Sequence, residues 1–360
     1  GSFGMAVTLK DIAEQTGVSP SVVSTVLSGR DNGTFVSENT RRKVIQVAEA
    51  LHYTPVRSGR PRGSRRLRRQ RTEHFIGVWD PDYSPYSAFY VQNLQTALSR
   101  HAHQAGAEAG DDFGLRLLTA EDLPRLDVLG IMGMILLSPN LLPREAASAT
   151  IPCVMIGETD NPPRELVQVH ADNAAAGRTL GDYLWILGHR RIAFLAPEAQ
   201  ARVTRRRFEG MQAAWTARQG NPAQIMTVSY DKPPTLPERD QVRRAVLDLL
   251  GPQASQTPRP TVLVCSDENV AALAVQTLTE IGCRIPLDIS LAGFGDTPRL
   301  AESLTPPLTT VRQPVAEIAY AAISQLYLLH EASADGSLVH DLALPGELVV
   351  RASCAPPTRS

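Results

Sequence analysis

The chain has 360 residues, of which 43% are hydrophobic and 20% are charged, and its formal net charge is −1. This length suits a small domain joined to a two-lobed one, and the hydrophobic content supports a sizeable core. No apolar run reaches membrane-spanning length, no secretory signal is present, and the four cysteines are scattered without a CxxC pair. We therefore expect a cytoplasmic protein with no membrane partner and no disulfide scaffold.

The near-zero net charge conceals an asymmetry along the chain. Residues 1–71 hold 13 Lys and Arg against 5 Asp and Glu, a balance of +8. Residues 72–360 hold 23 basic against 32 acidic residues, a balance of −9. A basic end on an acidic body indicates a polyanionic partner at that end only.

Residues 9–51 carry three helix patterns with clear start and stop signals. The first helix covers about 9–16 and is ended by Gly17. Ser19 and Ser37 are the expected N-cap residues of the second and third helices, because their hydroxyls accept bonds from the first turn. Two helices joined by a tight turn and braced by a third are typical of the helix-turn-helix, whose second helix enters the DNA major groove. A helical hairpin with no nucleic-acid role is the alternative.

A basic segment follows the three helices. Residues 57–71 contain eight arginines and no acidic residue. Most such runs are solvated linkers, but next to a helix-turn-helix this one is expected to contact DNA phosphates. Pro61 and Gly63 oppose a helix before Ser64.

From Phe75 onward apolar strands alternate with helices. We expect strands near 75–79, 115–118, 131–137, 152–156, 192–196, 224–229, 261–265 and 289–294, with helices near 86–105, 174–187, 204–218, 242–250 and 270–281. Fully apolar strands in this alternation predict parallel sheets covered by helices on both faces. Their repetition predicts two doubly wound lobes with a ligand site in the cleft between them.

Enzyme signatures are missing from the sequence. There is no GxSxG, phosphate loop, HExxH or GxGxxG motif, so no catalytic residue and no cofactor is assigned. His101 and His103 diverge on a helix, so a solvated face is expected there and no metal site. His189 follows a helix end, and we interpret it as structural, satisfying terminal carbonyls.

Several short motifs in both parts of the chain carry a family resemblance. In the N-terminal part they are Thr8-Leu9, Asp11-Ile12-Ala13, Gly17-Val18-Ser19, Val23-Ser24, Val26-Leu27, Val36-Ser37, Thr40-Arg41, Val44 and Tyr53-Thr54-Pro55. In the core they include Ile76-Gly77-Val78, Asp172-Asn173, the run from Leu187 to Ile192, Arg207-Phe208-Glu209-Gly210, Pro306 to Val311 and Leu344 to Ser353. Together these motifs resemble LacI-type transcriptional repressors. The segment between Ala107 and Leu129 is shorter than is usual in the family, which predicts a reduced helix there.

The resemblance implies the fold and its division. It predicts an N-terminal all-α helix-turn-helix domain and an α/β core with two lobes, doubly wound parallel sheets and three chain crossings, similar to periplasmic sugar-binding proteins. The domain bounds are 5–56 for the head, 57–74 for an Arg-rich hinge and 75–353 for the core. Lobe 1 is expected at about 75–171 and 297–325, and lobe 2 at about 172–296 and 326–353.

The resemblance also assigns DNA-contacting residues. Pro20, Ser21 and Thr25 correspond to base-contacting positions, and Ser28 lies near the backbone. In the hinge, Leu67 corresponds to a leucine wedged into the minor groove, although the linker before it is about five residues longer than usual. The full set of DNA candidates is Thr8, Leu9, Ser19, Pro20, Ser21, Ser24, Thr25, Ser28, Arg65, Arg66 and Leu67.

An effector site is implied in the cleft. Arg207 corresponds to an arginine that holds an effector hydroxyl or carboxylate, against the alternative of a surface arginine in a basic run. Where many relatives have Asn-Asp, this chain has Ser266-Asp267, and where they have Gly-Phe-Asp-Asp it has Gly293-Phe294-Gly295-Asp296. A site without that carboxamide and carboxylate would bind a polyol poorly. The effector candidates are Tyr83, Tyr86, Arg207, Ser266, Asp267 and Asp296.

The expected function is a DNA-binding transcription regulator, a repressor of a palindromic double-stranded operator, acting as a homodimer or tetramer. Its effector is a sugar-like compound, another small metabolite, or none. One alternative is a regulator whose core binds a protein partner. A further alternative is a solute-binding protein, which would leave residues 7–55 without a role.

Overall fold

The computed structural model describes residues 9–20, 22–23, 26, 37–51, 74–81, 85–104, 113–126, 128–137, 142–144, 151–163, 166–197, 202–230, 236–252, 254, 259–297, 299–331 and 340–358. Its contacts divide into two units, Gly1–Arg69 and Gln70–Ser360, and each unit is described by itself. In these ranges no helix combines the length and apolar character needed to span a membrane.

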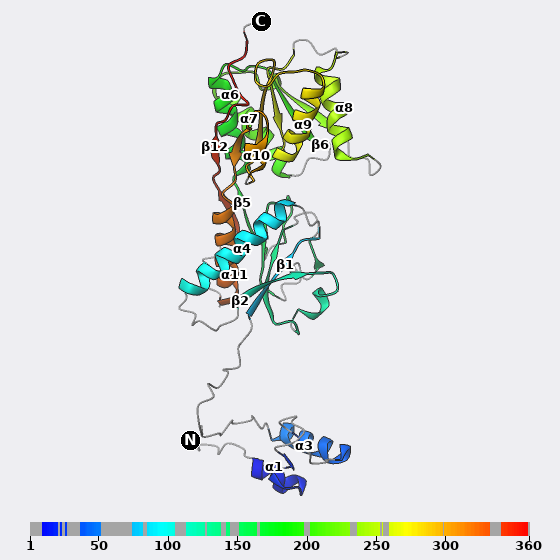
Figure 1. Cartoon of the computed structure of the whole chain (residues 1–360). Coiled ribbons are helices and arrows are strands. Elements are labelled where there is room, and N and C mark those ends of the chain that lie inside the picture. The colour runs from blue at the N-terminus through cyan, green and yellow to red at the C-terminus, as the bar shows by residue number, and fades with distance from the viewer. Residues whose placement is uncertain are drawn as a thin grey trace. The chain divides into compact units, whose positions relative to one another are not determined.

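The N-terminal unit is a small helical domain, the head. It contains α1 (Leu9–Thr16) and α3 (Glu38–Ala50), and the described residues between 20 and 26 are also helical (Figure 1). Both predicted N-caps are confirmed, because Ser19 Oγ accepts from the Val22 amide at 3.4 Å and Ser37 Oγ accepts from the Thr40 amide at 3.2 Å. The apolar residues of the three segments meet in one core, formed by Ile12, Ala13, Val23, Val26, Val44 and Ala48.

The first lobe of the C-terminal unit contains a six-stranded parallel sheet. Its strand order is β11-β5-β4-β3-β1-β2, with β1 His74–Trp79, β2 Phe113–Leu118, β3 Ile131–Leu136, β4 Cys153–Ile156, β5 Val167–Ala171 and β11 Asp341–Leu344. Helices α4 (Pro85–Gln104) and α11 (Val315–Glu331) pack together on one face, and the short η1 (Leu123–Arg125) lies with the core cluster of the other (Figure 1). Between β2 and β3 the described residues hold only η1, in agreement with the predicted reduced helix.

The second lobe contains another six-stranded sheet. Its order is β12-β10-β9-β8-β6-β7, with β6 Ile192–Pro197, β7 Ile225–Tyr230, β8 Val262–Cys265, β9 Ser290–Gly295, β10 Thr309–Arg312 and β12 Glu347–Val349. Only β12 is antiparallel to its neighbour. Alternate residues of β6 pack on opposite faces, against α6 (Asn173–Ile186) and α7 (Arg202–Ala217) or against α8 (Glu238–Leu250) and α9 (Glu268–Glu280). Short η2 (Pro222–Gln224) and α10 (Leu300–Ser303) complete this lobe.

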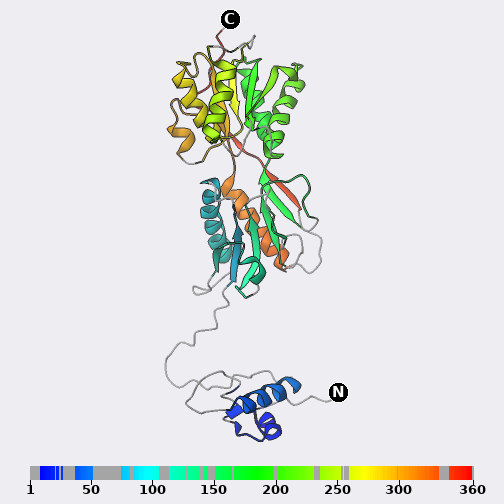
Figure 2. The same ribbon diagram turned by 90° about the vertical axis from the view of Figure 1, so that its right-hand side faces the viewer.

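Three segments of chain cross between the lobes (Figure 2). They join β5 to α6, β10 to α11, and β11 to β12. The first crossing lies where we expected it, but the other two lie elsewhere. Residues 300–312 belong to the second lobe because β10 pairs with β9. Residues 326–331 and 341–344 stay with the first lobe, because α11 continues along its sheet and β11 pairs with β5. The expected lobe assignment of 300–312, 326–331 and 341–344 is therefore corrected.

Helices α6 and α7 approach each other unusually closely, and two glycines make this approach feasible. A Cβ on Gly177 would lie 2.1 Å from the Arg207 carbonyl oxygen, and one on Gly210 would lie 2.2 Å from the Ala174 carbonyl oxygen. Each glycine therefore faces the backbone of the opposite helix, where no side chain fits. This contact fixes the middle of α7 against the first turns of α6.

His189 connects two distant parts of the second lobe. Its ring is fully buried and Nδ1 lies 2.9 Å from the Thr261 hydroxyl, just before β8. The expected structural role is present, but the ring contacts this hydroxyl rather than helix-terminal carbonyls. Burial lowers the pKa of His189 from 6.5 to about 4.

We predict that Gly210→Ala lowers the free energy of unfolding by about 2 kcal/mol, despite the better helix propensity of alanine, because the two backbones must separate. Urea unfolding measures the loss. The matched control is Glu209→Ala at the exposed neighbouring position, which should change stability by less than about 0.5 kcal/mol. Equal effects of the two variants would contradict the glycine argument.

We also predict a pH-dependent loss of stability from His189. Its pKa is lower in the folded than in the unfolded chain, so protons bind the unfolded chain first as pH falls from about 6.5 to about 4. The contribution is complete above pH 6.5 and decreases by up to about 3 kcal/mol over that range. Unfolding of the wild type and His189→Gln from pH 7 to 4 measures it. A stability difference that stays constant with pH would refute the prediction.

Candidate functional site

A cavity of about 400 Å³ lies between the two lobes, at the carboxyl ends of strands from both sheets. This is the position expected for a ligand site in paired doubly wound lobes. The first lobe lines it with Ser87, Tyr90, Leu137, Ile156, Gly157, His170 and Ala171. The second lobe contributes Asn173, Val203, Arg207, Asp267, Glu268, Asn269, Phe294, Gly295 and Gln313.

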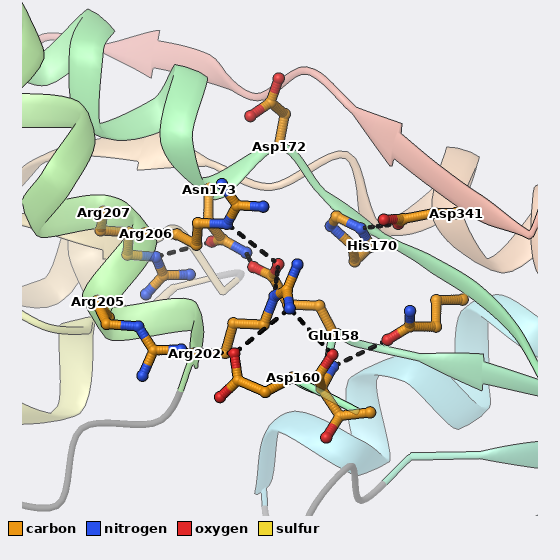
Figure 3. A network of polar contacts seen from close by, with 12 residues as sticks. Glu158, Asp160, His170, Asp172, Asn173, Arg202, Arg205, Arg206, Arg207 and Asp341 are labelled. Atoms are coloured by element: carbon orange, nitrogen blue, oxygen red, sulfur yellow. Dashed lines mark hydrogen bonds and ion pairs between the residues drawn. The ribbon is translucent and has the colours of Figure 1, made fainter. Parts of the chain in front are cut away.

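Arg207 lies in the wall of this cavity, held by groups of the second lobe. It is 4% exposed, and its Nε donates to Asn173 Oδ1 at 2.9 Å (Figure 3). A terminal nitrogen donates to the Ser266 carbonyl at 2.7 Å. Its guanidinium also lies over the Phe294 ring, 4.9 Å from the centroid. The surface alternative for Arg207 is therefore excluded. The close α6–α7 contact explains the position, because it brings Arg207 to the first residue of α6.

Ser266 and Asp267 are near the cavity in different ways. Asp267 lines it and is the N-cap of α9, since its Oδ1 accepts from the Asn269 and Val270 amides at 2.9 and 3.0 Å. Ser266 is buried and does not belong to the lining; its hydroxyl donates to Asp267 Oδ2 at 3.2 Å, and its carbonyl binds Arg207. Ser266 thus acts through its backbone.

Asp296 does not line this cavity, and its expected role as an effector ligand is corrected. Its side chain is 5% exposed and forms ion pairs with Arg312 at 2.7 Å and Arg351 at 2.8 Å. It lines a separate cavity of about 650 Å³ next to two of the crossings. The Asp296 carboxylate, which we expected to bind an effector, is instead paired with the guanidinium groups of Arg312 and Arg351.

Glu268 is a cavity residue that the sequence pattern did not reveal. Its buried carboxylate accepts bonds from the Asp296 and Thr297 amides, each at 2.8 Å, and from the Thr297 hydroxyl. Burial raises its pKa. Gly295 has a φ of 131°, and a Cβ there would lie 3.0 Å from the Glu268 carboxyl carbon. Many relatives carry an aspartate at the position of Gly295. In this chain the Glu268 carboxylate, from the start of α9, lies where that aspartate side chain would begin.

His170 and Asn173 were also missed as cavity residues. His170 Nε2 lies 2.6 Å from Asp341 Oδ1, and its Nδ1 lies 2.8 Å from the Ala171 carbonyl oxygen. The contact with Asp341 joins β5 to β11 beside the crossing. The motif Asp172-Asn173 was noticed in the sequence, but no local signal indicated that Asn173 meets Arg207, 34 residues further along the chain. Outside the cavity, the His101 ring stacks on Tyr327 with centroids 4.2 Å apart.

In the head, Ser19 and Pro20 are exposed at the start of the second helical segment. Leu9 is the first residue of α1, and Tyr86 is the second residue of α4. The structure does not describe the side chains of these two residues. The remaining candidates lie outside the described residues: Thr8, Ser21, Ser24, Thr25, Ser28, Arg65, Arg66, Leu67 and Tyr83.

Known proteins match the chain over both units. Residues 8–56 match the bacterial regulatory proteins of the lacI family, and residues 182–354 match the periplasmic binding protein-like domain. An uncharacterised helix-turn-helix transcriptional regulator from the aml 5′ region of Streptomyces limosus is 30% identical over 366 residues, which cover 96% of this chain and 94% of that protein.

Two solved structures share the fold. The lac repressor dimer bound to operator and the anti-inducer ONPF has a TM-score of 0.58 at 23% identity, over 98% of this chain and 100% of that one. A LacI family transcriptional regulator from Enterococcus faecium with bound ribose has a TM-score of 0.63 at 21% identity, over 79% and 100%.

Because residues 8–56 match the lacI family of regulatory proteins, the alternative of a stand-alone solute-binding protein is rejected. The Streptomyces relative spans nearly the whole chain, and the two sheets with their interlobe cavity agree with a periplasmic-binding-protein-like core. The chain belongs to the lacI family of DNA-binding transcription regulators and is not an enzyme.

Proposed function

We propose that this regulator is a repressor that binds a palindromic operator as a homodimer and responds to a small effector in the interlobe cavity. The proposed division is a head at 5–56, a hinge at 57–74 and a core from 75 to 353, in a cytoplasmic protein. The lac repressor structure, a dimer on its operator, supports the operator and dimer parts of the proposal. A tetramer, built from two such dimers, is the alternative assembly.

The head supplies the DNA-binding part. Ser19 and Pro20, at the start of the second helical segment, are exposed, as groove-facing residues must be. The base-contacting candidates of this segment are short, so direct recognition of bases is modest and the basic hinge supplies much of the affinity. Selection of bound sequences from a random DNA pool tests this proposal, and a selected pool without two-fold symmetric half-sites would reject it.

The hinge generates a prediction that separates charge from intercalation. Arg65→Gln with Arg66→Gln should flatten the dependence of log affinity on log salt by up to about two units on any DNA, because two fewer phosphates lose their counterions. Leu67→Ala should leave that slope unchanged and reduce the preference for operator over random DNA, since the deformation of the central step is lost. Salt titrations of both variants on both DNAs measure this. Equal weakening on both DNAs by Leu67→Ala would refute the wedge.

The cavity supplies the effector-binding part, and buried Arg207 is the observation that carries it. A guanidinium that is 4% exposed in the wall of a 400 Å³ interlobe cavity is suited to binding a hydroxyl or carboxylate. The ribose-bound regulator supports a sugar or a compound of similar size. The carboxylates of Asp267 and Glu268 line the same cavity, so hydroxyl hydrogens have acceptors there.

We predict that Arg207→Ala raises the effector concentration needed for a response about thirtyfold and leaves operator affinity in the absence of effector within about twofold. The lost charged hydrogen bond is worth about 2 kcal/mol, or about thirtyfold in effector affinity. Calorimetry against a metabolite panel, followed by operator binding with and without the compound found, measures this. Arg178→Ala, at an exposed position of α6, is the matched control. An unchanged effector response in Arg207→Ala would reject the assignment.

One observation favours a core that responds to a protein partner instead. The polar groups of the cavity already have partners inside the protein, among them Asn173 with Arg207 and Asp267 with the start of α9. A polar ligand must displace some of these bonds. Calorimetry separates the two functions, because a partner-responsive core would bind no compound of the panel.

A further inference from the structure

A polar network joins the two lobes at one side of the cavity. Glu158, Thr159 and Asp160 follow β4 in the first lobe, and Arg202 and Arg205 lie in the first turn of α7 in the second (Figure 3). Arg202 Nε donates to Glu158 Oε2 at 2.9 Å, and a terminal nitrogen of Arg202 donates to the Thr159 carbonyl at 3.2 Å. The start of α7, five residues before Arg207, is therefore bound to the opposite lobe.

Glu158 is the buried member of this network. Its side chain is 3% exposed, compared with 20% for Arg202 and 54% for Asp160. A carboxylate buried to this extent is stable only with a charged or hydrogen-bonding partner. Arg202 supplies the nearest charge from α7, and Arg206 Nε of the same helix lies 3.9 Å from the carboxylate. The buried position of Glu158 therefore depends on contact between the lobes.

Glu158 also contacts the partner of Arg207. Its Oε1 accepts from Asn173 Nδ2 at 2.8 Å, and Asn173 Nδ2 donates as well to the Ala171 carbonyl at 3.1 Å. The remaining polar atom of that amide, Oδ1, accepts from Arg207 Nε. Rotating the amide by half a turn would place its oxygen against the Glu158 carboxylate and its N–H groups against Arg207. The carboxylate therefore holds Asn173 in the orientation that Arg207 requires.

We propose that Glu158 is a positioning residue for the effector site: acting through Asn173, it holds Arg207 in place, and Arg202 makes this positioning depend on contact between the lobes. The effector role of Arg207 rests on the proposed function, whereas the positioning of its guanidinium is a property of the core alone. Occupancy of the cavity and apposition of the lobes are thereby linked through a single carboxylate.

Asp160 provides a matched control within the same loop. Its Oδ1 accepts from Arg205 at 2.6 Å and from Arg202 at 3.3 Å, so it shares Arg202 with Glu158 without touching Asn173. The hydrogen bond from Arg205 lowers the pKa of Asp160 below its usual value. Asp160→Asn removes an interlobe ion pair of the exposed rim, while Glu158→Gln leaves one acceptor oxygen for two donors, Arg202 and Asn173.

The test is the Nε–H resonance of Arg207 in the full chain, labelled on arginine nitrogen and measured without effector. Arg207→Lys identifies the resonance by its loss. Glu158→Gln should shift it and speed its exchange with solvent about tenfold, the effect of weakening one charge-assisted hydrogen bond. Arg202→Gln, which withdraws the nearer arginine from Glu158 and leaves only Arg206 Nε at 3.9 Å, should act in the same direction with a smaller effect. Asp160→Asn should leave the resonance in place.

An unchanged Arg207 resonance in folded Glu158→Gln would overturn the proposal, and so would an equal change in Asp160→Asn, because the effect would then come from the lobe contact in general. If Glu158→Gln does not fold, Arg202→Gln decides in the same way. These results are separable from the proposed function: a core that binds no compound of the metabolite panel would leave the Arg207 resonance and its response to Glu158→Gln unaffected.

Discussion

The close contact between α6 and α7 is the constraint on which the site depends. Gly177 and Gly210 each face a carbonyl of the opposite helix, at a separation that admits no side chain. With the middle of α7 held against the first turns of α6, the side chains one turn away must meet, and Arg207 reaches Asn173 across the same interface. A buried guanidinium needs partners at fixed distances, which helices at this spacing supply better than loops. The cavity wall is thus a product of helix packing.

The charges around the cavity are arranged so that each has a compensating partner. Arg207 binds a carboxamide and a backbone carbonyl, Asp267 binds the amides at the start of α9, and Glu268 binds those after β9. Because burying an ionised group without partners is very unfavourable, these bonds explain how several charged side chains share one wall. The same bonds mean that a ligand must compete with the protein for every charged group it contacts. Selectivity then depends on which internal bonds a ligand replaces at least cost.

Local patterns in the sequence predicted the parts of this protein that local physics determines. Strand and helix periodicity predicted the doubly wound sheets, and the capping serines Ser19 and Ser37 predicted helix starts that the structure confirms. Arg207 was found through family resemblance. Asn173, Glu158 and Glu268 were missed because their roles depend on partners that lie 15 to 44 residues away. Asp296 was misassigned because its partners, Arg312 and Arg351, reach it only after two later strands are in place. Two of the three crossings were misplaced because β10 and β11 are assigned to their sheets by pairing with β9 and β5, which no single segment of the sequence encodes.

The position of β11 and β12 has a consequence for how the chain acquires its structure during synthesis. These two short strands are the last in the described part of the chain, and each is the outermost strand of one sheet, β11 beside β5 and β12 beside β10. Until residues 341–349 have left the ribosome, the sheets end in β5 and β10, whose residues are nearly all buried in the finished protein, and not in the more exposed β11 and β12. An apolar strand with unpaired backbone groups is the feature by which strands of different chains associate. Neither lobe can therefore be completed ahead of the other, although most of the first lobe is made much earlier. Nascent or truncated chains lacking this segment are the form of the protein most exposed to aggregation, and co-translational protection is needed longest by the first lobe.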